Sequence, residues 1–185
     1  MTTPAIIISA IFVLLIFVIV LVYNKYVKNK NRMQEAWSII DVYLKKRYDL
    51  IPNLVEIVKG YASYEKSTLE EVTLIRTQAM QSQTVESKSV NETRLDKALV
   101  HLFGVVEKYP ELKANNSFLE LQEQISQVEN DLEKARRYYN GTVRVNNIFI
   151  ESFPVNLVAG LFNFHKGSFF QIDHKEKESA NISFI

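Results

Sequence analysis

FLELQEQISQVENDLEKARRYYNGTVRVNNIFIESF, residues 118 to 153, carries the longest regular pattern in the chain. Residues of one face recur there at alternating steps of three and four, which is the spacing of an α-helix. They are Phe118, Leu121, Ile125, Val128, Leu132, Ala135, Tyr139, Thr142, Asn146, Phe149 and Phe153. Ser117 and Glu120 have capping-box spacing at its start, and Pro154 ends it. A helix of about 50 Å predicts an elongated antiparallel bundle, with a parallel coiled-coil oligomer as the alternative.

A second apolar stripe covers residues 33 to 62 and contains a proline. Its members are Met33, Trp37, Ile40, Leu44, Tyr48, Ile51, Val55, Val58 and Ala62. Pro52 lacks a backbone donor and disfavours helical geometry at the residue before it. The stripe therefore predicts a kink or short break over residues 48 to 52, with Asp49 as the cap of the restarted helix. Together Asp49, Pro52 and Asn53 form a predicted helix corner.

The boundaries of the remaining helices follow from polar residues between the stripes. The second stripe either continues past Gly60 or restarts at Ser67, which has capping-box spacing with Glu70. Residues 81 to 91 lose the helical period and are rich in Ser, Gln and Thr, so we expect a surface connection there. A third helix is expected over residues 95 to 109.

The amino terminus has the pattern of a membrane anchor. From Ala5 to Val22 the chain is apolar apart from Ser9, and a helix over this span is about 27 Å long, close to the hydrocarbon thickness of a bilayer. Basic residues follow it directly, namely Lys25, Lys28, Lys30 and Arg32. The positive-inside rule predicts a single-pass protein of the inner (cytoplasmic) membrane, with its amino terminus outside and everything from about Asn24 in the cytoplasm.

Composition agrees with a helical protein. The 185 residues include 5 glycines and 4 prolines, fewer than a fold with many turns uses. The predicted class is all-α, with a transmembrane helix, an antiparallel four-helix bundle and a short C-terminal helix that begins at Pro154 and stops near Gly167. The expected divisions are a transmembrane helix at residues 1–23, a basic linker at 24–32, the bundle at 33–166 and a tail at 167–185.

The sequence lacks the motifs of common enzymes and metal proteins. It has no cysteine, no His-Glu-x-x-His motif, no phosphate-binding glycine loop and no Gly-x-Ser-x-Gly motif. No glutamate has a histidine three residues further on, which is the spacing found in di-metal bundles. The formal net charge of +1 indicates no general attraction to nucleic acid. We therefore expect no catalytic residue, no metal, no cofactor and no nucleic-acid partner.

The densest group of polar side chains lies at residues 135 to 147. Its candidate interaction or structural residues are Arg136, Arg137, Tyr138, Tyr139, Asn140 and Asn146. One interpretation is an interaction site, in which an arginine holds a carboxylate or phosphate group. The other is structural, with one arginine paired to Asp41, Asp49 or Glu56. In that case Asn146 fixes the register of the helices. We favour the structural interpretation, because no nucleophile or base accompanies the group.

An aromatic segment follows the long helix and is a candidate partner surface. Its members are Phe162, Phe164, Phe169 and Phe170. One interpretation is a lid that covers the bundle, and the other is an interface for a partner or for the membrane surface. We favour the lid, because aromatic faces of helices are more often buried than exposed.

Four segments, taken in order, carry a family resemblance. They are AWSIIDVYLKKRYDLIPNLVEIVKGYASYEKSTLEEV (36 to 72), KYPELKANNSFLELQEQI (108 to 125), ARRYYNGTVR (135 to 144) and ESFPVNLVAGLFNF (151 to 164). Together they resemble the LemA family of bacterial membrane proteins. The resemblance implies a membrane helix followed by an antiparallel helical bundle, and it implies no catalytic residues. Where the family tends to have an acid and a tyrosine after TVR, this chain has Val145 and Asn146.

The function expected from these features is binding without catalysis. The leading hypothesis is a membrane-anchored scaffold or adaptor, whose partners are the lipid bilayer and other membrane proteins, with a membrane protease suggested by the family resemblance. Self-association into a homo-oligomer is a further expectation. The alternative is a sensor whose bundle interior binds a small ligand through Arg136, Tyr139 and Asn146.

Overall fold

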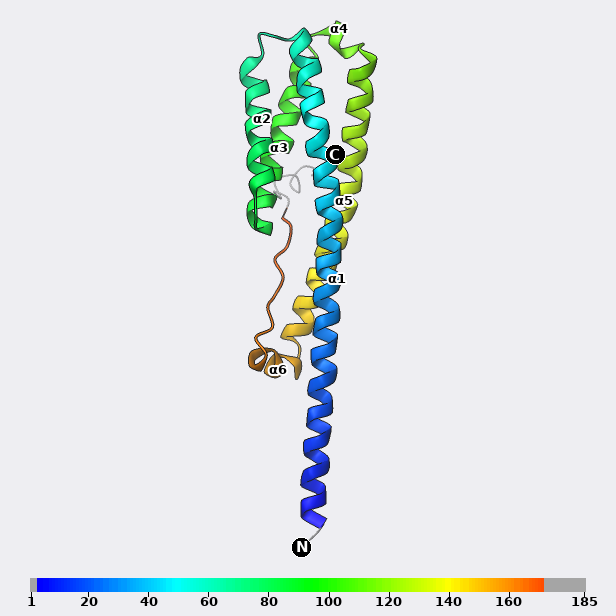
Figure 1. Cartoon of the computed structure of the whole chain (residues 1–185), viewed down its shortest axis with the longest axis vertical. Helices are drawn as coiled ribbons and strands as arrows, with labels where there is room; N and C mark the ends of the chain where they lie inside the picture. Colours follow the sequence, from blue (N-terminus) through cyan, green and yellow to red (C-terminus); the bar gives the residue numbers. More distant parts are fainter. Residues whose placement is uncertain (1–2, 172–185) are drawn as a thin grey trace, which may run out of the picture. The chain divides into compact units, whose positions relative to one another are not determined.

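The computed structural model describes residues 3–171, and every regular element in that range is a helix (Figure 1). The helices are α1 (Thr3–Tyr61), α2 (Lys66–Gln81), α3 (Val85–Val106), α4 (Pro110–Lys113), α5 (Asn116–Glu151) and α6 (Val155–Leu161). The all-α class and the long helix after Asn116 are therefore confirmed. Of the predicted tail, residues 172–185 lie outside the described range.

The chain forms two compact units. The first, here called the anchor unit, contains residues 3–40 and 137–168, and the second, the bundle unit, contains residues 41–136 and 169–171. The first part of α1, the last part of α5 and all of α6 belong to the anchor unit. The bundle unit contains the last part of α1, the first part of α5 and the whole of α2, α3 and α4.

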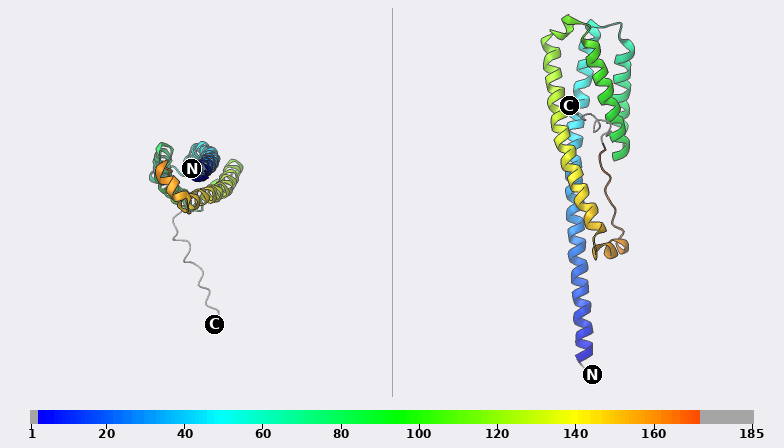
Figure 2. Two further views of the ribbon diagram at one scale, coloured as in Figure 1. Left: turned by 90° about the horizontal axis from the view of Figure 1, so that it is seen from below. Right: turned by 180° about the vertical axis from the view of Figure 1, so that it is seen from behind.

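Four helical segments lie side by side in the bundle unit, each antiparallel to the one before it (Figures 1 and 2). Short links favour this arrangement, since only residues 62–65 separate α1 from α2 and only residues 82–84 separate α2 from α3. Each helix buries an apolar stripe, and together the stripes contribute Leu44, Ile51, Leu54, Val58, Leu69, Val72, Ile75, Leu95, Leu102, Phe118 and Leu132. Burial of each such side chain contributes about 1.5–3 kcal/mol, so this core holds the bundle together. The predicted antiparallel bundle is confirmed.

The anchor unit begins with an exposed apolar span. An 18-residue window near the start of α1 has a mean hydropathy of 3.5, and none of it is buried. By length and composition, α1 is the one helix among residues 3–171 that could cross a membrane, which suggests a membrane anchor. Just after this span, Tyr26 stacks on Phe164 with ring centres 3.8 Å apart. Ile150 of α5 and Ala159 of α6 pack in the same cluster.

Helix α1 continues through Pro52 without the predicted break. The predicted corner of Asp49, Pro52 and Asn53 is therefore wrong, and all three side chains are exposed on the helix. Proline leaves the carbonyl group four residues earlier without its helical donor. That carbonyl belongs to Tyr48, and Arg76 Nε of α2 donates a hydrogen bond to it at 2.7 Å. A side chain of the neighbouring helix thus replaces the missing backbone bond.

The pairing of Arg76 with the proline site predicts a coupling between two substitutions. Arg76→Met leaves the Tyr48 carbonyl unsatisfied, and we expect it to lower the free energy of unfolding by about 1–2 kcal/mol. In a Pro52→Ala background the backbone N–H of the alanine can donate to that carbonyl. Arg76→Met should then lower the free energy of unfolding by about 1 kcal/mol less than it does in the native chain. Denaturant unfolding of the full chain in detergent micelles, followed by far-UV circular dichroism, measures the coupling. Additive effects of the two substitutions would contradict the compensation.

The sequence predicts a surface connection over residues 81 to 91, but the connection covers only residues 82–84, and the prediction is wrong for residues 85–91, which belong to α3. Thr84 and Ser87 form a capping box at its start, with the Ser87 N–H donating to Thr84 Oγ1 at 3.1 Å. Ser89 and Glu92 then lie on the buried face of the helix. Because polar residues occupy buried positions here, the hydrophobic period that marks a helix is lost.

The sequence left open whether the helix continues past Gly60 or restarts near Ser67, and the structure shows a restart. Helix α1 ends at Tyr61 and α2 begins at Lys66, so the chain restarts after a turn. The capping box predicted at Ser67 and Glu70 is wrong, since the N-cap position is Glu65 and no side chain caps this end.

The ends of the last two helices also differ from the predictions. The Asn115 side chain, and not Ser117, caps the start of α5 by accepting from the Phe118 N–H at 3.0 Å. Helix α6 ends at Leu161, well before the predicted end near Gly167.

Candidate functional site

Three charged side chains meet in the interior of the bundle unit. Arg47 of α1 and Arg136 of α5 are each 3% exposed, and Glu92 of α3 is 1% exposed. Arg47 Nη1 lies 2.9 Å from Glu92 Oε2, and Arg136 Nη2 lies 3.9 Å from the same oxygen. Tyr48 donates its hydroxyl to Glu92 Oε1. We call Arg47, Tyr48, Glu92 and Arg136 the buried ion network.

Two less buried carboxylates and one ring surround this network. Asp96 accepts a hydrogen bond from Arg47 Nη2. Glu129 lies 3.5 Å from Arg47 Nη2 and 3.6 Å from Arg136 Nη1. The Arg136 guanidinium carbon lies 4.9 Å from the centre of the Phe170 ring, a cation–π contact. Two guanidinium groups are thus held among three carboxylates and an aromatic face.

Each buried charge occupies a position where the helical stripe calls for an apolar residue. Arg47 follows Leu44 by three residues, and Arg136 follows Leu132 by four. Glu92 stands three residues before Leu95, at the same spacing. Glu92 was not among the residues predicted from the sequence, although an acid at helical spacing ahead of an apolar stripe is a signal that marks it.

Burial controls the ionisation of these groups. Burial raises the pKa of Glu92, although the two arginines and the Tyr48 hydroxyl oppose that rise. Burial alone would lower the pKa of Arg47, but the surrounding carboxylates, Asp96 most strongly, outweigh it and the pKa is raised. Burial and the charge of Glu92 raise the pKa of Tyr48, so its phenol stays protonated and acts as a donor.

The chemistry available to the network is binding and positioning. Within residues 3–171 no group of three or more His, Cys, Asp or Glu side chains is placed to hold a metal ion. Hydrogen bonds of this network join α1 to α3, and ion pairs at 3.5–3.9 Å connect α5 to both helices, an arrangement that favours one register of the helices. Arg136 is thus buried in the bundle unit and lies close to Glu92 and Glu129.

Arg136 nevertheless pairs with none of the three acids predicted for it. Asp41 lies 2.9 Å from Lys88 Nζ, and Glu56 lies 3.6 Å from Lys59 Nζ. Asp41 thus pairs with α3 and Glu56 pairs within α1, because the face of α1 that meets α5 is the face of Arg47.

The other five residues of the predicted polar group belong to the anchor unit. The Tyr139 hydroxyl donates to the Ser168 carbonyl at 2.9 Å, and its ring centre lies 5.3 Å from that of Trp37. Asn146 is fully buried, and its Nδ2 donates to the His165 carbonyl at 3.4 Å. These two side chains hold the segment after α6 against α5. Arg137 and Tyr138 line a surface pocket, and Asn140 is half-buried.

The four phenylalanines of the aromatic segment divide equally between packing and exposure. Phe164 and Phe170 are buried, whereas Phe162 is 43% exposed and Phe169 is 40% exposed. Other exposed apolar side chains lie at and beside α6, namely Phe153, Leu157 and Leu161. The segment is therefore neither entirely a lid nor entirely a surface.

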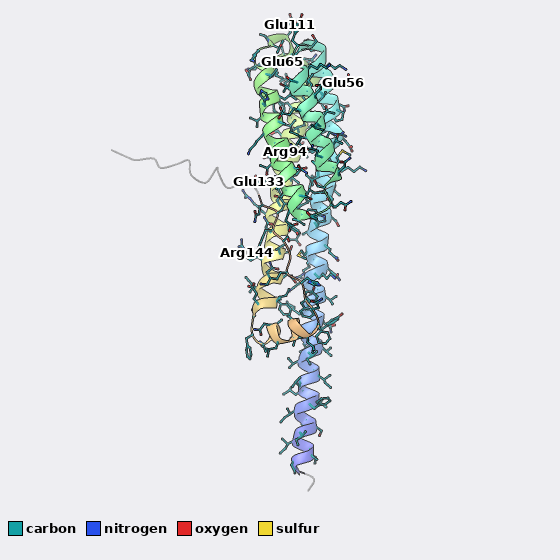
Figure 3. The ribbon with its side chains drawn as sticks, turned by 90° about the vertical axis from the view of Figure 1, so that its left-hand side faces the viewer. Glu56, Glu65, Arg94, Glu111, Glu133 and Arg144 are labelled. Atoms are coloured by element: carbon teal, nitrogen blue, oxygen red, sulfur yellow. The ribbon has the colours of Figure 1, made fainter. Side chains whose placement is uncertain are left out.

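A groove of about 700 Å³ lies between α1 and α2 in the bundle unit. Its lining residues are Val55, Glu56, Lys59, Ser63, Lys66, Leu69, Glu70, Thr73, Leu74 and Thr77. Leu74 is 58% exposed, and the side chain of Glu56, labelled in Figure 3, is 72% exposed. This volume lies within the range of natural binding sites, about 300–1,000 Å³.

The architecture and these sites define a class of protein: a helical bundle with an amino-terminal apolar span, whose interior charges pair with one another. Comparison with known proteins identifies the family. A model of the LemA family matches residues 36–184, and the chain belongs to the LemA family.

Individual relatives agree with this assignment. A protein LemA of Metamycoplasma hominis is 26% identical over 177 residues, which cover 93% of this chain and 81% of the relative. Magnetosome proteins MamQ 1 and MamQ 2 of Paramagnetospirillum magneticum are each 22% identical over 189 residues, covering 88% of this chain and 68% of theirs. These relatives are bacterial proteins.

Proposed function

We propose that this protein is a non-enzymatic, membrane-anchored adaptor whose bundle binds a helical segment of another membrane protein. The groove between α1 and α2 is the observation that carries this proposal. The exposed apolar span of α1 supplies the anchor and brings the groove to membrane partners.

The groove fits an amphipathic helix. Two antiparallel helices form its walls, and a third helix packs naturally along such a channel, ridge into groove. Val55, Leu69 and Leu74 provide apolar surface for the buried side of the partner. Ion pairs stand at its edges, Glu56 with Lys59 and Lys66 with Glu70, each at 3.6 Å, and they offer both signs of charge to the polar side.

Within this proposal the chain lies in the bacterial inner membrane, with its amino terminus outside and the bundle in the cytoplasm. The basic residues from Lys25 to Arg32 support that orientation through the positive-inside rule. The exposed side chains of Phe153, Leu157 and Leu161 belong to the same unit as the apolar span, and they support contact of α6 with the bilayer surface.

Site-specific photo-crosslinking tests the proposed groove. A benzoyl-phenylalanine placed at Thr77 of the full chain is expected to crosslink a membrane protein in living cells, through a helical peptide identified by mass spectrometry. Leu74→Asp should weaken this adduct about tenfold or more, because burial of a leucine contributes about 1.5–3 kcal/mol and a buried charge adds a penalty. Leu74 is mostly exposed, so the bundle should keep its fold.

The matched control places the same probe at Val100, which is 71% exposed on α3 and outside the groove. The same adducts at Thr77 and Val100, or adducts that persist in Leu74→Asp, would overturn the proposal. A crosslink to a second copy of the chain would replace the adaptor with self-association through this face.

The alternative function, a ligand site in the bundle interior, finds less support in the contacts. Arg136 faces carboxylates and the ring of Phe170 in the bundle unit. Tyr139 and Asn146 belong to the anchor unit, where each already bonds to backbone. A different pocket, in the anchor unit, is better suited to a ligand.

A further inference from the structure

A pocket of about 520 Å³ lies in the anchor unit, between α1 and α5. Asn29 and Arg32 of α1 line one side, and Arg137, Tyr138 and Thr142 of α5 line the other. None of the lining residues that the structure describes is acidic. The pocket therefore has two guanidinium groups and several neutral hydrogen-bonding groups around one space.

The buried side chain of Asn29 gives independent evidence that this pocket binds a polar ligand. It is 3% exposed, and neither atom of its amide group has a hydrogen-bond partner among the residues that the structure describes. A buried amide left without partners costs about 1–3 kcal/mol, so native proteins rarely keep one. Because this side chain lines the pocket, a polar ligand bound there would satisfy it. Tyr26 and Met33 stand three and four residues away at the neighbouring stripe positions, where the helix uses apolar side chains.

From this geometry we infer that the pocket binds a phosphate-bearing anion. Guanidinium groups bind phosphate oxygens with paired, charge-assisted hydrogen bonds, which two arginines across one pocket can supply together. Asn29 Nδ2 donates to a further oxygen, and Asn29 Oδ1 accepts from a hydroxyl or ammonium group of the ligand. The volume exceeds that of a bare phosphate and leaves room for an organic substituent.

The position of the pocket along α1 means that the anion can come from either of two sources, the membrane or the solution. Asn29 stands seven residues after Val22, about 10 Å along the helix from the end of the apolar span. The headgroup layer of a bilayer is about 5–7 Å thick, so a pocket at this level borders it. The anion is therefore either the headgroup of a phospholipid or a soluble organophosphate. This inference is independent of the proposed groove, whose residues belong to the bundle unit.

The test uses the full chain in dodecyl maltoside micelles, which contain no phosphate, and measures its thermal stability. In one arm glycerol 3-phosphate is added to the buffer. In the other arm no soluble phosphate is present and phosphatidylglycerol or phosphatidic acid is added to the micelles. We expect stabilisation in at least one arm, and the arm that responds identifies the source of the anion.

Variants decide whether the pocket is responsible. Arg137→Met should weaken the response about tenfold or more in ligand concentration, since one charge-assisted hydrogen bond is lost. Its matched control is Arg144→Met, which changes an exposed arginine of α5 outside the pocket (Figure 3). Gly141→Leu is a second variant that keeps every charge. A Cβ atom added at Gly141 meets no atom within 4 Å, and a leucine side chain extending from it would occupy the pocket, so it should abolish the response.

Asn29→Leu separates a ligand site from a structural role. Replacing an unpaired buried amide with an apolar side chain of similar size should leave the ligand-free protein equally or more stable, while the response to phosphate is lost. Loss of stability without ligand would show that Asn29 serves the fold, and would overturn the inference. The inference would also be overturned if neither arm showed stabilisation, or if Arg137→Met and Arg144→Met weakened the response to phosphate equally.

Discussion

Glu92→Ala in the full chain is expected to lower the free energy of unfolding by about 3–5 kcal/mol, the usual cost of removing one partner from a buried ion pair. Arg47 and Arg136 then lose the carboxylate at 2.9 and 3.9 Å, while both remain 3% exposed. An arginine cannot shed its proton to escape such a site. Asp96 and Glu129 remain, but they are 34% and 39% exposed, and both already pair with these arginines. Denaturant unfolding in micelles, followed by circular dichroism, measures the loss.

Two comparisons make this prediction specific. Arg47→Met should cost less than Glu92→Ala, because the buried carboxyl left behind can take up a proton and become neutral. Glu56→Ala removes an acid whose ion pair with Lys59 is exposed, and it should change stability by no more than about 0.5 kcal/mol. A cost for Glu92→Ala as small as that for Glu56→Ala would contradict the role given to the network.

The pH dependence of the same site has a definite sign. The pKa of Glu92 is raised in the folded protein, so the part of its stabilisation that depends on bound proton is complete below the usual value of 4.5 and is lost as the pH rises through the folded pKa. Glutamine cannot ionise and has no such dependence. The difference in stability between the native chain and Glu92→Gln should therefore narrow as the pH rises above 4.5. A widening difference would contradict the raised pKa.

The second large effect concerns the membrane span. Val13→Arg combined with Phe17→Arg is expected to stop the amino terminus from crossing the membrane. The span has 15 Leu, Ile, Val or Phe residues between Ala5 and Val22. These favour insertion by about 5–9 kcal/mol, whereas two central arginines oppose it by about 6–8 kcal/mol, counting the apolar residues they replace. The net free energy of membrane insertion then lies near zero, whereas a single arginine would leave insertion favourable.

The cysteine-free sequence makes this prediction easy to measure. With the native span, Thr3→Cys should react with a membrane-impermeant maleimide on intact spheroplasts, and Lys134→Cys should react only after lysis. The two arginines should reduce the Thr3→Cys signal several-fold, whereas the control Val13→Ala with Phe17→Ala should retain it. Labelling of Lys134→Cys in intact spheroplasts would contradict the orientation proposed for the chain.

Most of the fold could be predicted from the sequence, because helical periodicity is a local property. The span of α1, the stripe from Met33 to Ala62 and the whole of α5 follow from residues three or four positions apart. Two predictions failed for reasons that are not local. Pro52 does not break α1, because its missing donor is supplied by Arg76, which is distant in the sequence. The start of α3 was missed because Ser89 and Glu92 fill buried positions with polar groups.

The candidate sites were predicted less completely than the fold. The sequence marked Arg136 as part of a polar group, but its acidic partners, Glu92 and Glu129, could not be chosen among 21 acidic residues before the helices were brought together. The sequence also placed Asn29 in a row of polar and basic residues, where nothing distinguished it. Only its burial without hydrogen-bond partners separates it from its neighbours.

The sequence by itself determined the helical class, the apolar span and the stripes that form the core, because side chains repeat along a helix with a fixed period. The tertiary structure decided which charges became buried and paired, and which polar groups were left around an open pocket. Those outcomes depend on which helix faces meet, and in this chain the faces that meet place Glu92 between two arginines and leave Asn29 without a partner among residues 3–171.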